Sequence, residues 1–256
     1  MRALRFVVIG WWLHLKMIAV TAFEGFLQVV WPLFFATVAM LVYRIGGDQN
    51  ALIYAGLGAS VMGVWSAMAT TATSALQRER SNGTLELVAC GPAPIALVVI
   101  PITVALATVG LYSFVTTLLW ARVLFGVAIT VANLPAFALS LVVMIVALGL
   151  LGFLLSLLAV RYRTAWALGN LLEYPGWLIC GFIIPLVILP EWLRPLSYAM
   201  APTWGMQAIR KSAAGDWPWL DIGVCALLGL AYGVVGIVVS EALLRSARRH
   251  ATLSLS

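Results

Sequence analysis

Charged residues are distributed very unevenly along this chain of 256 residues. Residues 51 to 77 contain no charge, and the stretch from Leu87 to Val160 contains only Arg122. A membrane-spanning helix needs about 20 apolar residues, so the first run has room for one span and the second for two. Because 63% of all residues are hydrophobic and 9% are charged, a water-soluble domain could not bury this much apolar surface. The chain is predicted to be a polytopic membrane protein.

Six segments are long and apolar enough to be predicted as transmembrane helices. Asn133 and Pro135 mark the entry to the fourth, because both residue types favour the start of a helix. We therefore expect an all-α integral membrane protein with six transmembrane helices in one domain over residues 1 to 256. The predicted spans cover residues 20 to 43, 51 to 75, 95 to 120, 135 to 159, 165 to 189 and 218 to 243.

The first stretch, Met1 to Lys16, combines basic residues with an apolar run. Trp11, Trp12 and His14 interrupt this run, and no small-residue cleavage site follows it, unlike in a signal peptide. Apolar, aromatic and basic residues together are typical of a helix that lies in the membrane interface. We expect residues 1 to 17 to form such an interfacial amphipathic helix.

Lysine and arginine are divided unequally between the two sides of the predicted bundle. Loops rich in these residues tend to remain in the cytoplasm. We therefore expect both termini to be cytoplasmic in a multi-pass protein of the cell membrane, and the net charge of +6 then requires no nucleic-acid partner. Arg2, Arg5, Lys16, Arg78, Arg80, Arg161, Arg163, Arg245, Arg248 and Arg249 lie on one side, against Arg44, Arg122, Arg194, Arg210 and Lys211 on the other.

Residue types used for metal or catalytic chemistry are scarce. The three cysteines lie in or beside predicted spans, and the two histidines lie near opposite ends of the chain. This number and spacing of cysteines favours apolar packing over a disulfide framework or metal site. We expect no catalytic residue, metal site or cofactor in this chain. The residues are Cys90, Cys180, Cys225, His14 and His250.

Neither of the two lysines follows a glycine: Lys16 follows Leu15, and Lys211 follows Arg210. A phosphate-binding loop needs a Gly-Lys pair, because backbone amides hold the phosphates while the lysine reaches the terminal ones. If ATP drives this protein, a separate polypeptide must bind the ATP and Mg²⁺.

The connection between the second and third predicted spans, residues 77 to 88, is unusually rich in charge. Arg78, Glu79, Arg80 and Glu86 lie within it, and Asn82-Gly83 is expected to break or bend a helix there. One interpretation is a solvated loop whose basic residues only fix the orientation of the chain. The other is a segment along the membrane surface that presents charges and leucines to a soluble partner.

The amino-acid sequence of this segment favours the second interpretation. Residues 78 to 86 read RERSNGTLE, which resembles the "RERxxGTLE" stretch of type-2 permeases of ATP-binding cassette (ABC) exporters, in the matching position after the second span. In that family this element is the coupling helix, which docks into the nucleotide-binding subunit. The resemblance implies ATPase-coupling roles for Arg78, Glu79, Arg80, Gly83, Thr84, Leu85 and Glu86.

A second block supports the resemblance from the other half of the chain. Residues 189 to 198 read LPEWLRPLSY, and they are followed by Ala201-Pro202-Thr203-Trp204 and by Ala208-Ile209-Arg210. This block resembles the family's segment between spans five and six, which forms short outward-facing helices and corresponds here to residues 190 to 217. Family members usually have Asn-Pro where this chain has Ala201-Pro202. The resemblance implies a second permease subunit and separate ATPase subunits as partners.

Two carboxylates are placed within predicted spans, where an ionisable group costs about 2.5 to 3.5 kcal/mol and therefore needs a reason. Glu24 lies early in span one, where extension to the surface or pairing with a nearby basic residue is the favoured interpretation. Glu173 lies deeper, in span five, beside Pro175. For Glu173 a buried, hydrogen-bonded structural role and a role in substrate contact or gating are equally favoured.

In the resembling family, spans two and five of each half line the central pathway. This implies a set of candidate pathway or gating residues, although core packing explains the two tryptophans and the methionine more simply. The candidates are Trp65, Met68, Asn170, Glu173, Tyr174 and Trp177.

Small residues four positions apart form faces on which helices can approach closely. Gly56 with Ser60, Ala59 with Gly63, and Gly229 with Gly233 are such pairs. Their spacing does not decide whether the contacts are within one chain or between two subunits.

We therefore expect the membrane-spanning subunit of an ATP-driven exporter of a hydrophobic or amphiphilic substrate, with drugs or antibiotics favoured over lipids or lipid-linked polysaccharides. A secondary transporter that uses Glu24 or Glu173 as a cation site is an alternative, but no internal repeat of the kind common in such folds is evident. A membrane enzyme would need a polar catalytic cluster, for which the sequence offers few candidates.

Overall fold

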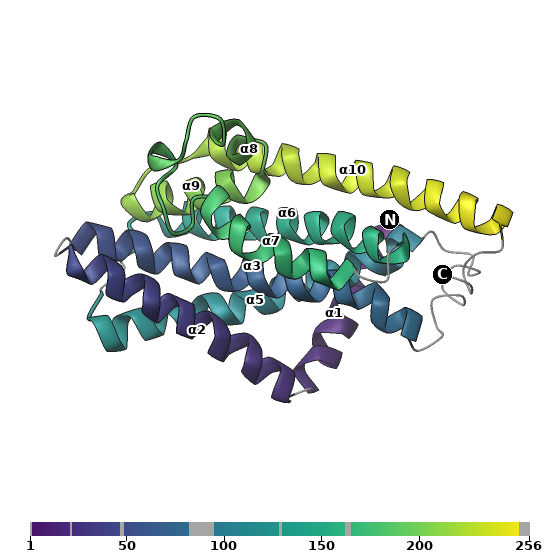
Figure 1. Cartoon of the computed structure of the whole chain (residues 1–256), viewed down its shortest axis with the longest axis horizontal. Coiled ribbons are helices and arrows are strands. Elements are labelled where there is room, and N and C mark those ends of the chain that lie inside the picture. The colour runs from purple at the N-terminus through teal and green to yellow at the C-terminus, as the bar shows by residue number, and fades with distance from the viewer. Residues whose placement is uncertain are drawn as a thin grey trace.

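The computed structural model describes residues 2–20, 22–46, 49–81, 95–127, 130–161 and 165–250 (Figure 1). These residues form helices and short turns without a strand, so the predicted all-α class is confirmed. The helices are α1 (Arg2–Val20), α2 (Ala22–Ile45), α3 (Gln49–Ser81), α5 (Ile95–Phe125), α6 (Leu134–Arg161), α7 (Ala165–Ile179), η1 (Leu186–Ile188), α8 (Arg194–Tyr198), α9 (Ala201–Ala214) and α10 (Trp219–His250).

The long helices run in alternate directions through one bundle. In Figure 1, α3, α6 and α10 end on the right, whereas α2, α5 and α7 end on the left, where α8 and α9 also lie. We call the left-hand end, which carries α8 and α9, the α9 end of the bundle. The predicted segment between spans five and six therefore does form short helices, and all of them lie at one end.

Helix α3 is the centre of the bundle. It packs against α2, α5, α6 and α7, and every residue from Ala55 to Ala69 is buried. This explains its composition, since a helix that is covered on all sides has no polar face. The 33 residues of α3 give it a length of about 50 Å, and its last turns carry charged residues beyond the apolar part.

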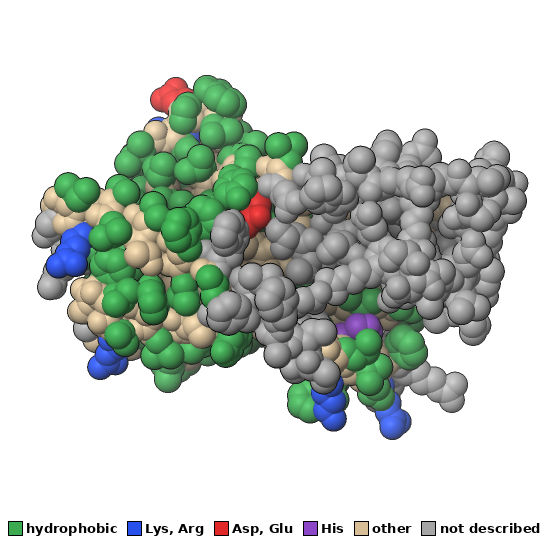
Figure 2. All heavy atoms as spheres, turned by 60° about the horizontal axis from the view of Figure 1, so that its bottom comes forward, with side chains coloured by type: hydrophobic (Ala, Val, Ile, Leu, Met, Phe, Trp, Pro, Cys, Tyr) green, Lys and Arg blue, Asp and Glu red, His purple; other side chains and the backbone are tan. Residues whose placement is uncertain are grey.

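Among the described residues, four helical stretches are long and apolar enough to cross a membrane: Asn50–Ala69, Ala96–Phe125, Leu134–Leu157 and Trp219–Leu243. A shorter apolar stretch, Pro32–Ile45, lies within α2. Hydrophobic side chains cover most of the described surface in Figure 2, and lysines and arginines lie near its edges. Together with the composition, these helices define an all-α membrane protein.

The predicted span over residues 165 to 189 is helical only in its first part. Helix α7 has 15 residues, or about 22 Å, which is less than the hydrocarbon thickness of about 30 Å. Bends at residues 180 to 184 and the 3-10 helix η1 follow it. The chain therefore turns sideways after α7 and reaches α8 and α9 without a continuous helix.

Local signals set two of the helix ends. The side-chain oxygen of Asn133 accepts a hydrogen bond from the backbone N–H of Ala136 at 3.1 Å, so the predicted start of this helix at Asn133 is confirmed. In a different connection, between α9 and α10, α9 stops at Gly215, whose φ of 111° suits glycine.

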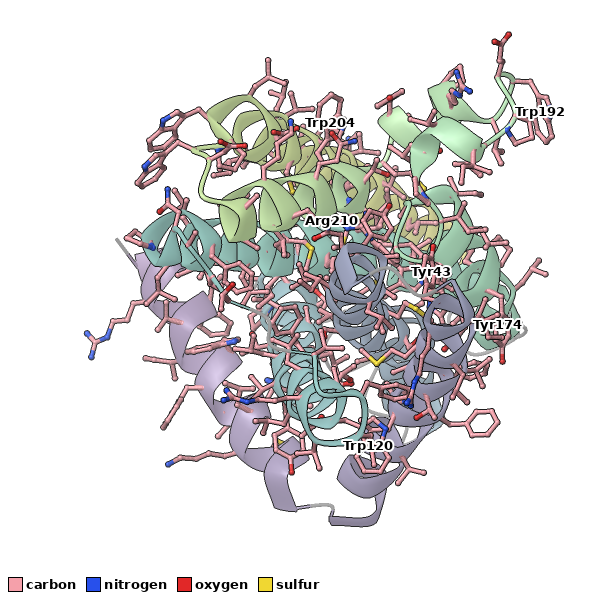
Figure 3. All side chains as sticks on the ribbon, turned by 90° about the vertical axis from the view of Figure 1, so that its left-hand side faces the viewer. Tyr43, Trp120, Tyr174, Trp192, Trp204 and Arg210 are labelled. Atoms are coloured by element: carbon pink, nitrogen blue, oxygen red, sulfur yellow. The ribbon has the colours of Figure 1, made fainter. Side chains whose placement is uncertain are left out.

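Helix α1 crosses the bundle instead of joining it. Figure 3 looks along the bundle from the α9 end, and α1 (purple, lower left) is seen from the side. The indole Nε1 of Trp11 donates to Thr108 Oγ1 at 3.1 Å, which attaches α1 to α5. Phe6, Ile9, Leu13 and Met17 lie along the opposite face and are each at least half exposed. This arrangement suits the predicted interfacial helix.

Candidate functional site

The predicted coupling segment begins within a helix. Residues 77 to 81, which include Arg78, Glu79 and Arg80, are the last residues of α3. Their side chains lie outside the part of the structure that is described, as do Gly83, Thr84, Leu85 and Glu86 in full. In Figure 1 this end of α3 lies at the same end of the bundle as the ends of α6 and α10. The coupling role of these residues stays a prediction.

The candidate pathway residues lie on two adjacent helices. Trp65 and Met68 belong to α3, whereas Asn170, Glu173, Tyr174 and Trp177 belong to α7, and the two helices pack side by side. Trp65 has 1% of its surface exposed, and Met68 has none. In the conformation described, neither side chain can contact a molecule that passes outside this chain. The side chains of Asn170 and Glu24 are outside the described part.

Trp65 and Glu173 form the polar contact between α3 and α7. The indole Nε1 of Trp65 donates to the backbone oxygen of Glu173 at 3.1 Å. The Glu173 side chain is hydrogen-bonded to Ser66, and only 5% of the residue is exposed. In this conformation Glu173 is therefore a buried carboxylate with a partner on the neighbouring helix.

Three aromatic rings gather where α7 meets α2. The ring centroid of Trp177 is 4.8 Å from that of Phe35 and 5.0 Å from that of Tyr174, both in edge-on geometry. Tyr174 is 47% exposed and Trp177 only 5%, so the cluster extends from the core to the surface. The indole Nε1 of Trp177 has no hydrogen-bond acceptor among the described residues. Such a cluster offers an apolar aromatic surface for contact with a second subunit or an apolar molecule.

The small-residue faces are used within the chain. A methyl group added at Gly63 would meet the Ser113 side chain of α5 at 2.1 Å, and one added at Gly229 would meet Ala147 of α6 at 2.8 Å. Gly233 also faces α6, through Leu150. The hydroxyl of Ser60 donates to the backbone oxygen of Gly56 at 2.8 Å, so this pair belongs to one turn of α3.

A polar cluster that sequence reasoning missed lies at the α9 end. Arg210 of α9 points into the bundle, and its two terminal nitrogens donate to the backbone oxygens of Gly181 and Phe182, each at 2.8 Å. Its guanidinium carbon lies 3.3 Å from the ring centroid of Tyr54, which is on α3. In Figure 3, Arg210 and Tyr43 lie near the middle of this end, whereas Trp192 lies at its edge.

Two tyrosines complete this cluster. The hydroxyl of Tyr43, on α2, donates to the backbone oxygen of Ile183 at 2.5 Å, and that of Tyr54 donates to Gly181 at 3.4 Å. We call Arg210, Tyr43, Tyr54 and the turn at residues 180 to 184 the α9 bracket. No spacing in the sequence indicates it, because its members lie far apart in the chain, with 156 residues between the positions of Tyr54 and Arg210 and more between those of Tyr43 and Arg210.

Groups that could hold a metal ion do not come together in the described ranges, where no three His, Cys, Asp or Glu side chains form a suitable cluster. Cys180 and Cys225 are buried free thiols. The Sγ atom of Cys180 lies 3.7 Å from the Sδ atom of Met200, which is an ordinary apolar contact.

A bundle of apolar helices with short helices at one end and a charged helix extension at the other defines an all-α membrane protein. The sequence matches the family model of the ABC-2 type transporter over residues 5 to 213, and the chain therefore belongs to this family. The match runs from Arg5 in α1, through the predicted coupling segment, to Ala213 in α9. No curated protein matches the chain.

Proposed function

We propose that this chain is the permease subunit of an ATP-driven exporter that moves a hydrophobic or amphiphilic compound, such as a drug or an antibiotic, out of the cell. The observation that carries this proposal is the charged extension of α3. Its sequence resembles that of the family's coupling helix, and it continues the helix that is buried at the centre of the bundle. ATP and Mg²⁺ would be bound by a separate ATPase subunit.

The geometry of α3 provides a route for the motion. ATP binding would bring two ATPase subunits together and displace residues 77 to 88 of each permease. Since α3 is a continuous helix of about 50 Å that packs against four others, a displacement at its charged end is transmitted to α7 and to the α9 end. The pathway between two permease subunits would then open on the outer side.

The apolar exposed face of α2 and α7 is the surface that we assign to the second permease. Val38, Leu41, Val42, Leu171 and Leu178 are exposed there, beside Tyr174. In the resembling family, span five lines the pathway between the two halves, which suits this face. In this arrangement both termini and the charged end of α3 face the cytoplasm, and the α9 end faces outward.

Co-expression of the chain with the ATPase encoded beside it tests the proposal. We expect the two proteins to purify as one complex that hydrolyses ATP, and we expect Glu79→Ala and Gly83→Pro to reduce both assembly and hydrolysis. Glu241→Ala is the matched control, because Glu241 is an exposed glutamate towards the same end of the bundle, and among the described residues its ion pair is with Arg245 on its own helix, at 3.3 Å.

Three outcomes are informative. If the chain binds no ATPase and still transports in vesicles without ATP, the ion-coupled alternative replaces the exporter. If the complex forms and Glu79→Ala, Gly83→Pro and Glu241→Ala all behave like the wild type, the coupling assignment is wrong. Uptake of a fluorescent amphiphilic dye into inverted vesicles, compared with flipping of a labelled lipid, decides between the two substrate classes.

A further inference from the structure

Arg210 is an unusual residue to find inside this bundle. It lies on a helix between two spans, its side chain is largely buried, and none of its hydrogen bonds within the described ranges is to a carboxylate. Burial lowers the pKa of its guanidinium from 12.5 to about 10, so it is still charged at neutral pH. A buried charge of this kind is costly unless other groups stabilise it.

The turn after α7 supplies the stabilisation. Its backbone oxygens make no hydrogen bond within a helix, and a hydrogen bond from a charged donor to such an oxygen is stronger than a neutral one. Gly181 and Phe182, directly after α7, direct their oxygens at the two terminal nitrogens of Arg210. The Tyr54 ring adds a cation–π contact at 3.3 Å. Arg210 therefore joins α9 to the end of α7 and to α3.

Backbone packing at the same point is equally close. A methyl group on Gly58 of α3 would lie 1.8 Å from the backbone oxygen of Phe182, so the turn rests directly on α3. Gly181 has a φ of 73°, which glycine adopts without strain. Tyr43 attaches the other side of the turn to α2. Contacts from three helices thus fix a turn of five residues.

We infer that Arg210 is a positioning residue that makes α9, the turn after α7 and the adjoining ends of α2 and α3 move as one rigid body. This goes beyond the proposed function, which requires only that motion at the charged end of α3 reaches the opposite end. The α9 bracket gives the reason why α8 and α9 would follow α3. The charged side chain of Arg210 attaches α9 at one point to two backbone oxygens of the turn and to the Tyr54 ring of α3.

Distances between spin labels test this inference in the full chain, reconstituted in lipid nanodiscs. Cysteines at Ile45, the last residue of α2, and Val187, in η1, carry the labels, because these side chains are 89% and 81% exposed. Cys90 is replaced by serine, whereas Cys180 and Cys225 are buried and stay. We expect one narrow distance peak in the wild type and loss of this peak in Arg210→Gln.

Lys211→Gln is the matched control. It removes a positive charge from the next position of the same helix, but Lys211 pairs with Asp221 of α10 at 2.7 Å and not with the turn. The narrow peak should survive this substitution. Arg210→Lys should restore the peak in part, since lysine keeps the charge but cannot donate to two carbonyls in a plane and stack on Tyr54.

Tyr43→Phe is the second variant, which tests the inference even if Arg210→Gln does not fold. This substitution removes only one hydroxyl group from the α9 bracket. We expect it to broaden the peak less than Arg210→Gln. A wild-type peak in both variants, or the same broadening in Lys211→Gln, would overturn the inference. In the complex with the ATPase, the Ile45–Val187 distance should be equal before and after trapping with vanadate. If no ATPase binds, the proposed function fails, while the comparison of variants in the chain alone still decides the role of Arg210.

Discussion

Two tryptophans on neighbouring helices show how differently one residue type can be used. Trp65 is buried, and its Nε1 donates to the backbone oxygen of Glu173. Trp177 is nearly as buried, but its Nε1 has no acceptor among the described residues. A hydrogen bond that is made contributes about 0.5 to 1.5 kcal/mol, whereas a buried donor without an acceptor costs free energy. The two residues therefore differ in energetics although they are equal in size.

Replacing each tryptophan by phenylalanine exploits this contrast. Trp65→Phe should lower the free energy of unfolding by about 1 kcal/mol more than Trp177→Phe, because both lose the same volume but only Trp65 loses a hydrogen bond. Thermal unfolding of the purified protein in detergent measures the difference. Equal losses in the two variants would show that the Trp65–Glu173 hydrogen bond adds nothing to stability.

Residue roles were only partly predictable from the sequence. The family resemblance implies that Trp65 and Glu173 belong to one pathway, but it does not predict that the two residues are in direct contact. The sequence places Arg210 in the block that resembles the family's segment between spans five and six, and among five basic residues on the outer side, but it predicts no contact for its side chain. Its partners, Gly181 and Tyr54, lie 29 and 156 residues away in the chain, and no local pattern encodes such contacts.

At the scale of the helix, the length of an uncharged apolar run predicts well where a helix lies. The residue at which a helix ends is harder to predict from the sequence. Helix α3 contains residues 51 to 75, and α6 contains residues 135 to 159. Long uncharged apolar runs have few structural alternatives to a helix. The end of α7 at Ile179 was not predicted, since the residues after it are as apolar as those before it. Contacts with Arg210, Tyr43 and Gly58 hold that turn, and they come from other parts of the chain.

The contact between α6 and α10 depends on a close approach at Gly229. A side chain there would overlap with Ala147, whereas a side chain at Gly223 of the same helix would meet nothing within 4 Å. Gly229→Val should therefore destabilise the protein by about 1 to 3 kcal/mol, and Gly223→Val should be nearly neutral. The fraction of protein that stays soluble in detergent after heating compares the two. A loss in Gly223→Val as large as in Gly229→Val would contradict the packing of these helices.

At the scale of the whole molecule, the two ends of the bundle differ in chemistry. Exposed aromatic residues gather at the α9 end, among them Trp192, Trp217 and Trp219, and the last two rings stack at 4.8 Å. Tryptophan is enriched where a membrane meets water. The opposite end carries the charged turns of α3 and α10. Tryptophans mark both faces of a membrane, whereas basic residues favour the cytoplasmic side, so the arginines in the last turns of α3 and α10 support the proposed orientation, in which the α9 end faces outward.

Labelling of single cysteines in intact cells tests the orientation. In a Cys90→Ser background, Trp192→Cys should react with a membrane-impermeant maleimide, because Trp192 is exposed at the α9 end. Arg5→Cys, on α1, should react only after the membrane is permeabilised. Both variants should react fully in detergent, which controls for accessibility. Reaction of Arg5→Cys in intact cells would place the N-terminal helix on the outer side.

The complete burial of the middle of α3 has a consequence for the influence of lipids. In the apolar window of α3, 72% of the residues are buried within the chain, against 28% in that of α10. A change in bilayer thickness acts on the surfaces that lipids touch. It should therefore tilt or shift α10 before it affects α3, so that the helix proposed to transmit the force of ATP binding is shielded from the surrounding membrane by its own neighbours.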